Sequence, residues 1–210
     1  MYKALIYCVL LSAFISFNGY SVEISYTLLN GTKGTINVPD DIIEISAFKG
    51  NMNFIRSNGD RINLRTVSPM TEIIGIENLP VLKRMELALQ LHCDNLLFLR
   101  NSSLEYLLIN WLTELNDLDF LINLPNLKYL GLQAMNYNNN VMDLRNTQIK
   151  YLIVSYIWTN ETIEIIRNNY LEEFIYFYSN IVLNDNQNIK IVNNYNDFRF
   201  EQKHFSLFDW

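Results

Sequence analysis

Cysteine and histidine are nearly absent from this chain of 210 residues, which holds two of each. Cys8 falls inside an apolar N-terminal segment that we expect to be removed, so Cys93 would remain alone and could form no intramolecular disulfide. His92 and His204 are too few to build a Cys/His metal cluster. The sequence therefore predicts neither a disulfide framework nor a metal site, and stability must come from packing.

Charge is also scarce. Charged residues make up 18% of the chain, below the roughly 25% of an average soluble protein. The net charge is −6 and the cations form no run, whereas binding to nucleic acid requires clustered Lys and Arg. We therefore expect no nucleic-acid partner. After the N-terminal segment, no stretch reaches about 18 apolar residues without a charge, so we expect no membrane span in the mature chain.

The N-terminus has the pattern of a secretion signal. Lys3 is the only charge there, and residues 4–17 are almost wholly apolar. Gly19 and Ser21 supply small residues at the −3 and −1 positions of a cleavage site. We predict a signal peptide from Met1 to Ser21, and hence a secreted or cell-surface protein. A buried N-terminal strand or an uncleaved anchor is the alternative.

Five segments share the pattern L-x-x-L-x-L, with other apolar residues at some leucine positions. Their starts are separated by 22, 23, 22 and 22 residues, a period typical of leucine-rich repeats. The segments are 82–87, 104–109, 127–132, 149–154 and 171–176. The alternation predicts a short strand with one buried face in each repeat. Stacked repeats would pair these strands in parallel over a continuous core.

The stretch Leu121-Ile-Asn-Leu-Pro-Asn-Leu-Lys-Tyr-Leu-Gly-Leu132 resembles the leucine-rich-repeat superfamily, in particular the 22-residue repeats of bacterial internalin-type proteins. The resemblance covers roughly residues 73–192. It implies an α/β-type repeat fold, a solenoid with a parallel β-sheet on its concave face. That family usually has Asn or Cys at the ninth repeat position, where it ties the turn backbone together. The residues at that position here are Gln90, Leu112, Met135, Ile157 and Ser179.

A solenoid must be capped, because both of its ends otherwise expose the core. Residues 22–38 alternate around a turn-like segment at 30–34 and predict an N-terminal β-hairpin. We therefore divide the chain into a signal peptide (1–21), an N-terminal cap with irregular first repeats (22–70), the leucine-rich repeats (71–192) and a C-terminal cap or tail (193–210). The aromatic-rich tail is expected to fold over the terminal core or, alternatively, to be a docking peptide.

The outward-facing repeat positions predict a partner-binding surface. The third, fifth and seventh residues of each repeat point away from the core. Three consecutive repeats have tyrosine at the third position, and these rings should stack about 4.8 Å apart. The expected binding residues are Tyr106, Leu108, Tyr129, Gln133, Tyr151, Ile153, Ile175 and Phe177. An apolar, tyrosine-rich surface is typical of protein recognition, although such ladders can also simply stabilise a parallel sheet.

Sequons of the form N-x-[ST] begin at Asn30, Asn101 and Asn160. They become glycosylation sites only if the chain passes through a eukaryotic-type secretory pathway. Asn101 and Asn160 fall in predicted loops, where a glycan would be tolerated.

Together these features predict a secreted or surface-exposed protein that recognises another protein through its concave face. The alternative is an intracellular adaptor with an uncleaved N-terminus, which would suit the lone Cys93. An enzyme is not expected, because the histidines match no Ser or Cys motif and no phosphate-binding loop is present. Glu172 and Glu173 are adjacent and would point to opposite faces of a strand. No cofactor is predicted.

Overall fold

The structure is a computed structural model that describes residues 20–48, 50–88, 96–110, 114–159, 161–177, 179–184 and 188–193. The predicted signal peptide except its last two residues, Cys93, Asn160 and the predicted tail after residue 193 lie outside the described residues. Within these ranges the structure is almost entirely β, and its helices are two short 3-10 segments, η1 (Ile76–Asn78) and η2 (Asp119–Asn123). In this part of the chain no helix has the length and apolar character needed to cross a membrane.

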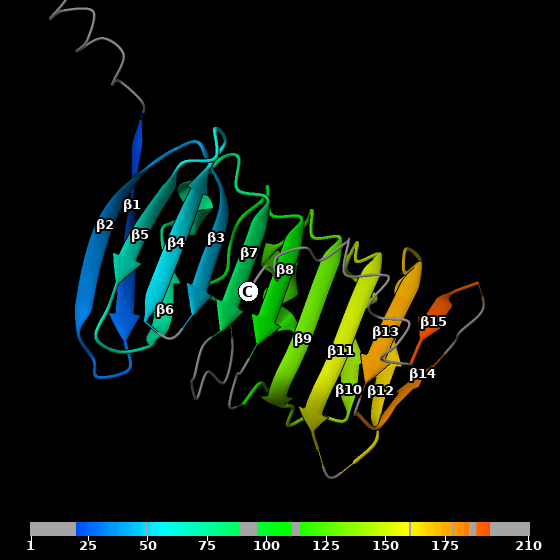
Figure 1. The fold of residues 1–210 in the computed structure, drawn as a ribbon. Helices are drawn as coiled ribbons and strands as arrows, with labels where there is room; N and C mark the ends of the chain where they lie inside the picture. Colours follow the sequence, from blue (N-terminus) through cyan, green and yellow to red (C-terminus); the bar gives the residue numbers. More distant parts are fainter. Residues whose placement is uncertain are drawn as a thin grey trace, which may run out of the picture.

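A nine-stranded sheet forms the spine of the molecule, in the order β15-β13-β11-β9-β8-β7-β3-β4-β5 (Figure 1). Its strands are β3 (Ile42–Phe48), β4 (Asn51–Arg56), β5 (Arg61–Arg65), β7 (Arg84–Ala88), β8 (Tyr106–Asn110), β9 (Tyr129–Asn136), β11 (Tyr151–Trp158), β13 (Glu173–Phe177) and β15 (Lys190–Val192). Pairing is parallel from β15 to β3 and antiparallel from β3 to β5. The molecule is thus a mostly-β repeat solenoid with a parallel sheet, as the repeat period predicts.

The strands of the solenoid keep the register of the sequence repeat. Each of the five predicted segments contributes one strand, which begins at the third residue of its repeat. Equivalent positions pair across the sheet, so Tyr106 is opposite Tyr129, and Tyr129 is opposite Tyr151. The fourth and sixth residues of each repeat face the core. A shift of one residue in the pairing would turn these apolar side chains away from the core, so the positions of the leucines fix the register.

The N-terminal cap contains the predicted hairpin, since β1 (Ser21–Leu28) pairs antiparallel with β2 (Lys33–Pro39). β6 (Met70–Ile74) adds to the other side of β1 and completes a three-stranded sheet. The expected irregular first repeats are instead a meander of β3, β4 and β5, in which only β3 pairs with the repeat strands. Residues 42–47 have the repeat frame, with Ile42, Ile45 and Ala47 all buried.

The return arms of the repeats are short, and none of those described contains an α-helix. Three late arms form the strands β10 (Val141–Asp143), β12 (Ile163–Ile166) and β14 (Ile181–Leu183), which pair in parallel as a third sheet. Earlier arms use the 3-10 segments η1 and η2. The expected α/β class is therefore not what these residues form: arms of about a dozen residues rich in Asn and Ile favour extended structure over a helix.

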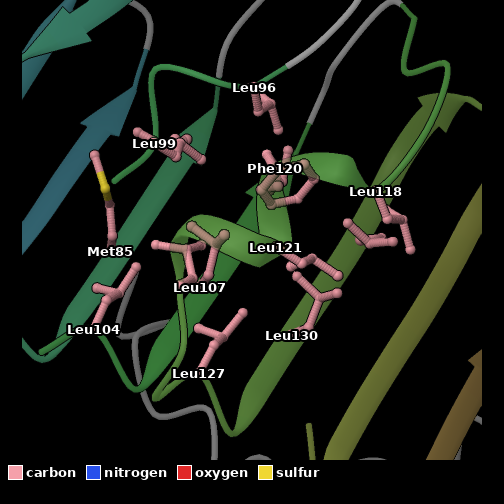
Figure 2. Close-up of a cluster of buried hydrophobic side chains, with 14 of the residues drawn as sticks. Met85, Leu96, Leu99, Leu104, Leu107, Leu118, Phe120, Leu121, Leu127 and Leu130 are labelled. Atoms are coloured by element: carbon pink, nitrogen blue, oxygen red, sulfur yellow. The ribbon is translucent and has the colours of Figure 1, made fainter. Parts of the chain in front are cut away.

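The main apolar core lies between the nine-stranded sheet and the return arms. The first leucine or isoleucine of every repeat is buried in it. Leu118, Leu121 and Leu124, the apolar positions predicted for one return arm, are also buried. Figure 2 shows how Leu118, Phe120 and Leu121 around η2 meet Leu107 and Leu130 of the sheet.

Candidate functional site

The open face is the face of the nine-stranded sheet opposite the core. The third, fifth and seventh residues of each repeat lie on it, because side chains alternate along a strand. The predicted tyrosine ladder is present there (the tyrosine ladder is Tyr106, Tyr129 and Tyr151). The ring centroids of Tyr106 and Tyr129 are 4.0 Å apart and those of Tyr129 and Tyr151 4.4 Å, with planes tilted by 7° in both pairs. The three rings are half-buried and therefore keep one accessible edge.

Charged groups lie at both ends of the tyrosine ladder. The Arg84 guanidinium lies 5.2 Å from the centroid of the Tyr106 ring, within cation–π range. At the other end the Tyr151 hydroxyl donates to Glu172 Oε2 at 3.0 Å. Burial and a hydrogen bond with Tyr129 raise the pKa of Tyr106 to about 12. Burial and the bond to Glu172 raise the pKa of Tyr151. Both phenols therefore stay neutral at physiological pH and can donate hydrogen bonds.

A row of ion pairs runs beside the tyrosine ladder, at the second position of each repeat. Glu105 accepts from Lys83 at 2.7 Å and from Lys128 at 2.9 Å, and the two ammonium groups hold the pKa of Glu105 below its usual value. Lys150 donates to Glu172 at 2.7 Å. We did not derive this row from the sequence, but the signal that would have indicated it is that all five repeats have a charged residue at the second position, with both signs present.

The apolar strip is the second feature of the open face (the apolar strip is Leu108, Ile153, Ile175, Phe177 and Val192). The sequence led us to expect the first four of these side chains at the surface. They are instead 1–7% exposed, and the last four form a cluster of their own, separate from the main core, against which Tyr129 packs. The Leu108 side chain leans over Gly131, whose missing side chain leaves the room for it. Gln133 is half-buried next to this strip.

The N-terminal part of the open face is polar. Arg61, Arg65 and Arg84 are exposed on it. Glu86 lies between the arginines and the apolar strip and is 7% exposed. Burial and the nearby negative charge of Glu44 raise the pKa of Glu86 to about 7. The face thus changes from polar and basic at the cap to aromatic and apolar along the later repeats.

Two buried asparagines tie the turns together, and sequence reasoning placed neither of them in this role. The Asn101 Nδ2 group donates to the carbonyls of Ile76 and Leu79, and Asn168 Nδ2 donates to those of Thr147 and Ile149. Both stand three residues before the first leucine of a repeat, and this recurrence is the signal that would have found them.

The three sequon asparagines have different environments. Asn101 is 3% exposed and uses its amide in the bonds just described, so a glycan on Nδ2 is incompatible with this packing. Asn30 is exposed in the β1–β2 turn, where its Oδ1 accepts from the Thr32 backbone N–H at 3.0 Å. Asn160 lies outside the described residues.

An open hollow of about 1080 Å³ lies where β9 and β11 end. Asparagine is the commonest residue in its lining, which also includes Trp158 and, as the one carboxylate among the described lining residues, Glu161. The Ser179 hydroxyl there accepts from the Ile157 N–H and donates to the Phe177 carbonyl, so it is engaged in the turn. Within the ranges that the structure describes, no group of three or more His, Cys, Asp or Glu side chains could hold a metal ion.

Comparison with known proteins identifies no relative of this chain. No protein-family model, no curated protein and no solved structure matches the chain. The tyrosine ladder is therefore the strongest feature on which a function can be argued.

Proposed function

We propose that this protein is a secreted or surface-exposed leucine-rich-repeat protein that recognises another protein through its open face. The observation that carries the proposal is the tyrosine ladder, with Arg84 at one end and Glu172 at the other. Stacked rings are already ordered before binding, so little side-chain entropy remains to be lost on association. Tyrosine also combines a large apolar area with a hydroxyl, which makes it common among residues that dominate binding energy.

The chemistry of this face suits a protein partner better than a small polar substrate. The ladder offers flat aromatic edges and neutral hydroxyl donors, while the arginines of the cap would meet acidic groups of the partner. Charge complementarity of that kind speeds association and selects among partners, while the tyrosines supply the affinity. No residue on this face needs to carry out chemistry in such a role.

The test compares Tyr129→Ala with Tyr170→Ala. Tyr170 is 56% exposed in the turn before β13 and lies outside the ladder, so it controls for loss of a tyrosine as such. Proteins retained by the wild type and by Tyr170→Ala but not by Tyr129→Ala would be identified from extracellular material and their affinity measured. We expect Tyr129→Ala to weaken that affinity about 30-fold, the size of a hot-spot loss of about 2 kcal/mol. Unchanged affinity in both Tyr129→Ala and Tyr151→Ala would contradict the proposal.

Secretion is tested separately by the mass and N-terminal residue of the protein recovered from medium and from cells. A chain beginning at Val22 in the medium would support the proposal. A full-length chain retained in the cytosol would favour the intracellular adaptor, and partners would then be sought inside the cell.

A further inference from the structure

The hollow at the ends of β9 and β11 (the arrowheads of these strands in Figure 1) is lined by five asparagines, and we call it the asparagine hollow. The eighth residue of each of the two repeats, Ala134 and Tyr156, has a left-handed backbone. Beyond it the strands pair again, with Asn136 beside Trp158. A left-handed backbone is unfavourable for residues other than glycine, so its recurrence after 22 residues indicates a feature of the repeat that sets the ends of both strands.

Three asparagines of the hollow are oriented by one hydrogen bond and keep the other half of the amide for a ligand. Asn138 Nδ2 donates to Asn116 Oδ1 at 2.9 Å, and its own Oδ1 remains an acceptor. Asn180 Nδ2 donates to Thr162 Oγ1 at 2.9 Å, with the same consequence. Asn139 Oδ1 instead accepts from a backbone N–H at 3.1 Å, so its Nδ2 remains a donor. Donors and acceptors are thus held in place before a ligand binds.

An exposed indole and a carboxylate complete the lining. Trp158 is 57% exposed at the hollow. Glu161 is exposed as well, and among the described residues it forms no ion pair. In the same part of the chain, the amides of Asn136 and Asn140 form no side-chain hydrogen bond. The hollow therefore combines one aromatic ring with many unengaged polar groups.

This lining suits one class of ligand better than others. Among the described lining residues there is no Lys, Arg or His, which a phosphate or sulfate group would require. The lining is also too polar for a lipid, because sites for apolar ligands are mostly hydrophobic. A sugar fits both parts of it. Sugar hydroxyls donate to and accept from amides and carboxylates, and the C–H groups of a pyranose ring pack against the negative face of an indole.

We propose that the asparagine hollow binds a neutral glycan, with Trp158 stacked on a pyranose ring and the asparagine amides bonded to its hydroxyls. The hollow of about 1080 Å³ is as large as the upper end of the roughly 300–1,000 Å³ that is usual for small-molecule sites, so it has room for several sugar units. The site does not depend on the proposed function, because no residue of the tyrosine ladder lines it.

Isothermal titration calorimetry with the full chain tests the ligand class. The protein is produced in a bacterial host, so that the sequon at Asn160 carries no glycan. The probes are maltohexaose, mannohexaose and chitohexaose, which are neutral chains of glucose, mannose and N-acetylglucosamine. We expect at least one of them to bind, and Trp158→Ala to weaken its binding by about tenfold. Tyr170→Ala removes a ring that is 56% exposed in another turn and should bind as the wild type does.

The contribution of the amides is measured in the same way. Asn136→Ala and Asn140→Ala should each weaken binding by about threefold to tenfold. Asn58→Ala removes an exposed asparagine from the turn between β4 and β5 and should leave binding unchanged. Tyr129→Ala should also bind the sugar as the wild type does, which separates this site from the open face. Urea unfolding of each hollow variant should give the wild-type midpoint, because Trp158 and both asparagines are exposed.

Retention of ribonuclease B or ribonuclease A on the immobilised protein separates two sources of the sugar, because the two share one polypeptide and only ribonuclease B carries a neutral N-linked glycan. Binding of a free oligosaccharide would show that sugar alone suffices. Retention of ribonuclease B without binding of any oligosaccharide would assign the ligand to protein-linked glycans. Failure of ribonuclease B and of all three oligosaccharides at about 10 mM would overturn the proposal, and so would binding that Trp158→Ala leaves unchanged.

Discussion

Glu86 is a buried acid whose charge should weaken the fold at neutral pH. It lies on β7 between Ser46 of β3 and Leu108 of β8, and it is 7% exposed. Burial, with the charge of Glu44 nearby, raises the pKa of Glu86 from 4.5 to about 7. Each pKa unit corresponds to ~1.4 kcal/mol, so this rise represents about 3 kcal/mol. Replacement of Glu86 by glutamine removes the charge and keeps the size of the side chain.

The sign of the effect depends on pH. Because the pKa of Glu86 is raised in the folded state, the folded protein binds the proton more tightly than the unfolded chain. The stability that this binding contributes is fully present below about pH 4.5 and is lost as the pH rises to about 7. We therefore expect Glu86→Gln to match the wild type near pH 4.5. At pH 8 its free energy of unfolding should be higher by up to about 3 kcal/mol.

Urea unfolding at a series of pH values between 4.5 and 8 measures this difference. Glu105→Gln is the control with the opposite sign, because Lys83 and Lys128 hold the pKa of Glu105 below its usual value. That variant should lose stability at pH 8, and the loss should shrink as the pH falls. The reasoning is refuted if Glu86→Gln is less stable than the wild type at pH 8. A stability difference that stays constant from pH 5 to pH 8 would refute it as well.

Three further outcomes follow from single residues. Asn168→Ala leaves buried carbonyls unpaired and should lower the free energy of unfolding by about 2–4 kcal/mol. Asn58→Ala, at an exposed turn, should change that free energy by less than about 0.5 kcal/mol. Thermal or urea unfolding measures both differences. In a eukaryotic secretory host, glycopeptide mass spectrometry should find sugar on Asn30 and none on Asn101; occupied Asn101 in folded protein would contradict the described packing. Ala134 has a φ of 50°, in the left-handed region that favours glycine. Ala134→Gly should therefore not show the decrease of about 1 kcal/mol in the free energy of unfolding that glycine usually causes in a strand. A decrease of that size would argue against the left-handed backbone at this position.

Much of the fold was predictable because the repeat frame depends only on where apolar side chains can be buried. The parallel ladder, its register and the stacking of Tyr106, Tyr129 and Tyr151 all follow from that frame. The strand at Ile42–Phe48 falls in the region expected to hold irregular first repeats, but its frame was not identified because 40 residues separate it from the next frame, with β4, β5 and β6 inserted between them. The absence of α-helix from the described return arms was not predicted, because the resemblance rested on the strand positions.

The candidate site was predictable in position but not in exposure. Sequence alternation correctly assigned Ile153, Ile175 and Phe177 to the face opposite the core. Alternation alone does not say how far that face is exposed to solvent, and Ile153 and Ile175 are only 1% and 4% exposed. The role of Asn101 was hidden for a related reason: a local N-x-[ST] triplet says nothing of the two carbonyls, 22 and 25 residues earlier, to which its amide is bound.

The change from parallel to antiparallel pairing at β3 closes the N-terminal end of the solenoid, while the number of repeats beyond it can change in evolution. Beyond β3 the sheet continues only through antiparallel strands that end at β5, where exposed Arg61 and Arg65 discourage pairing with another chain. The later repeats contact little beyond their neighbours, so a unit of 22 residues could be duplicated or deleted among them without redesign of the cap. Each such event would lengthen or shorten the open face by one strand, about 4.8 Å. In evolution, the extent of the open face could therefore change in discrete steps while the N-terminal end stayed the same.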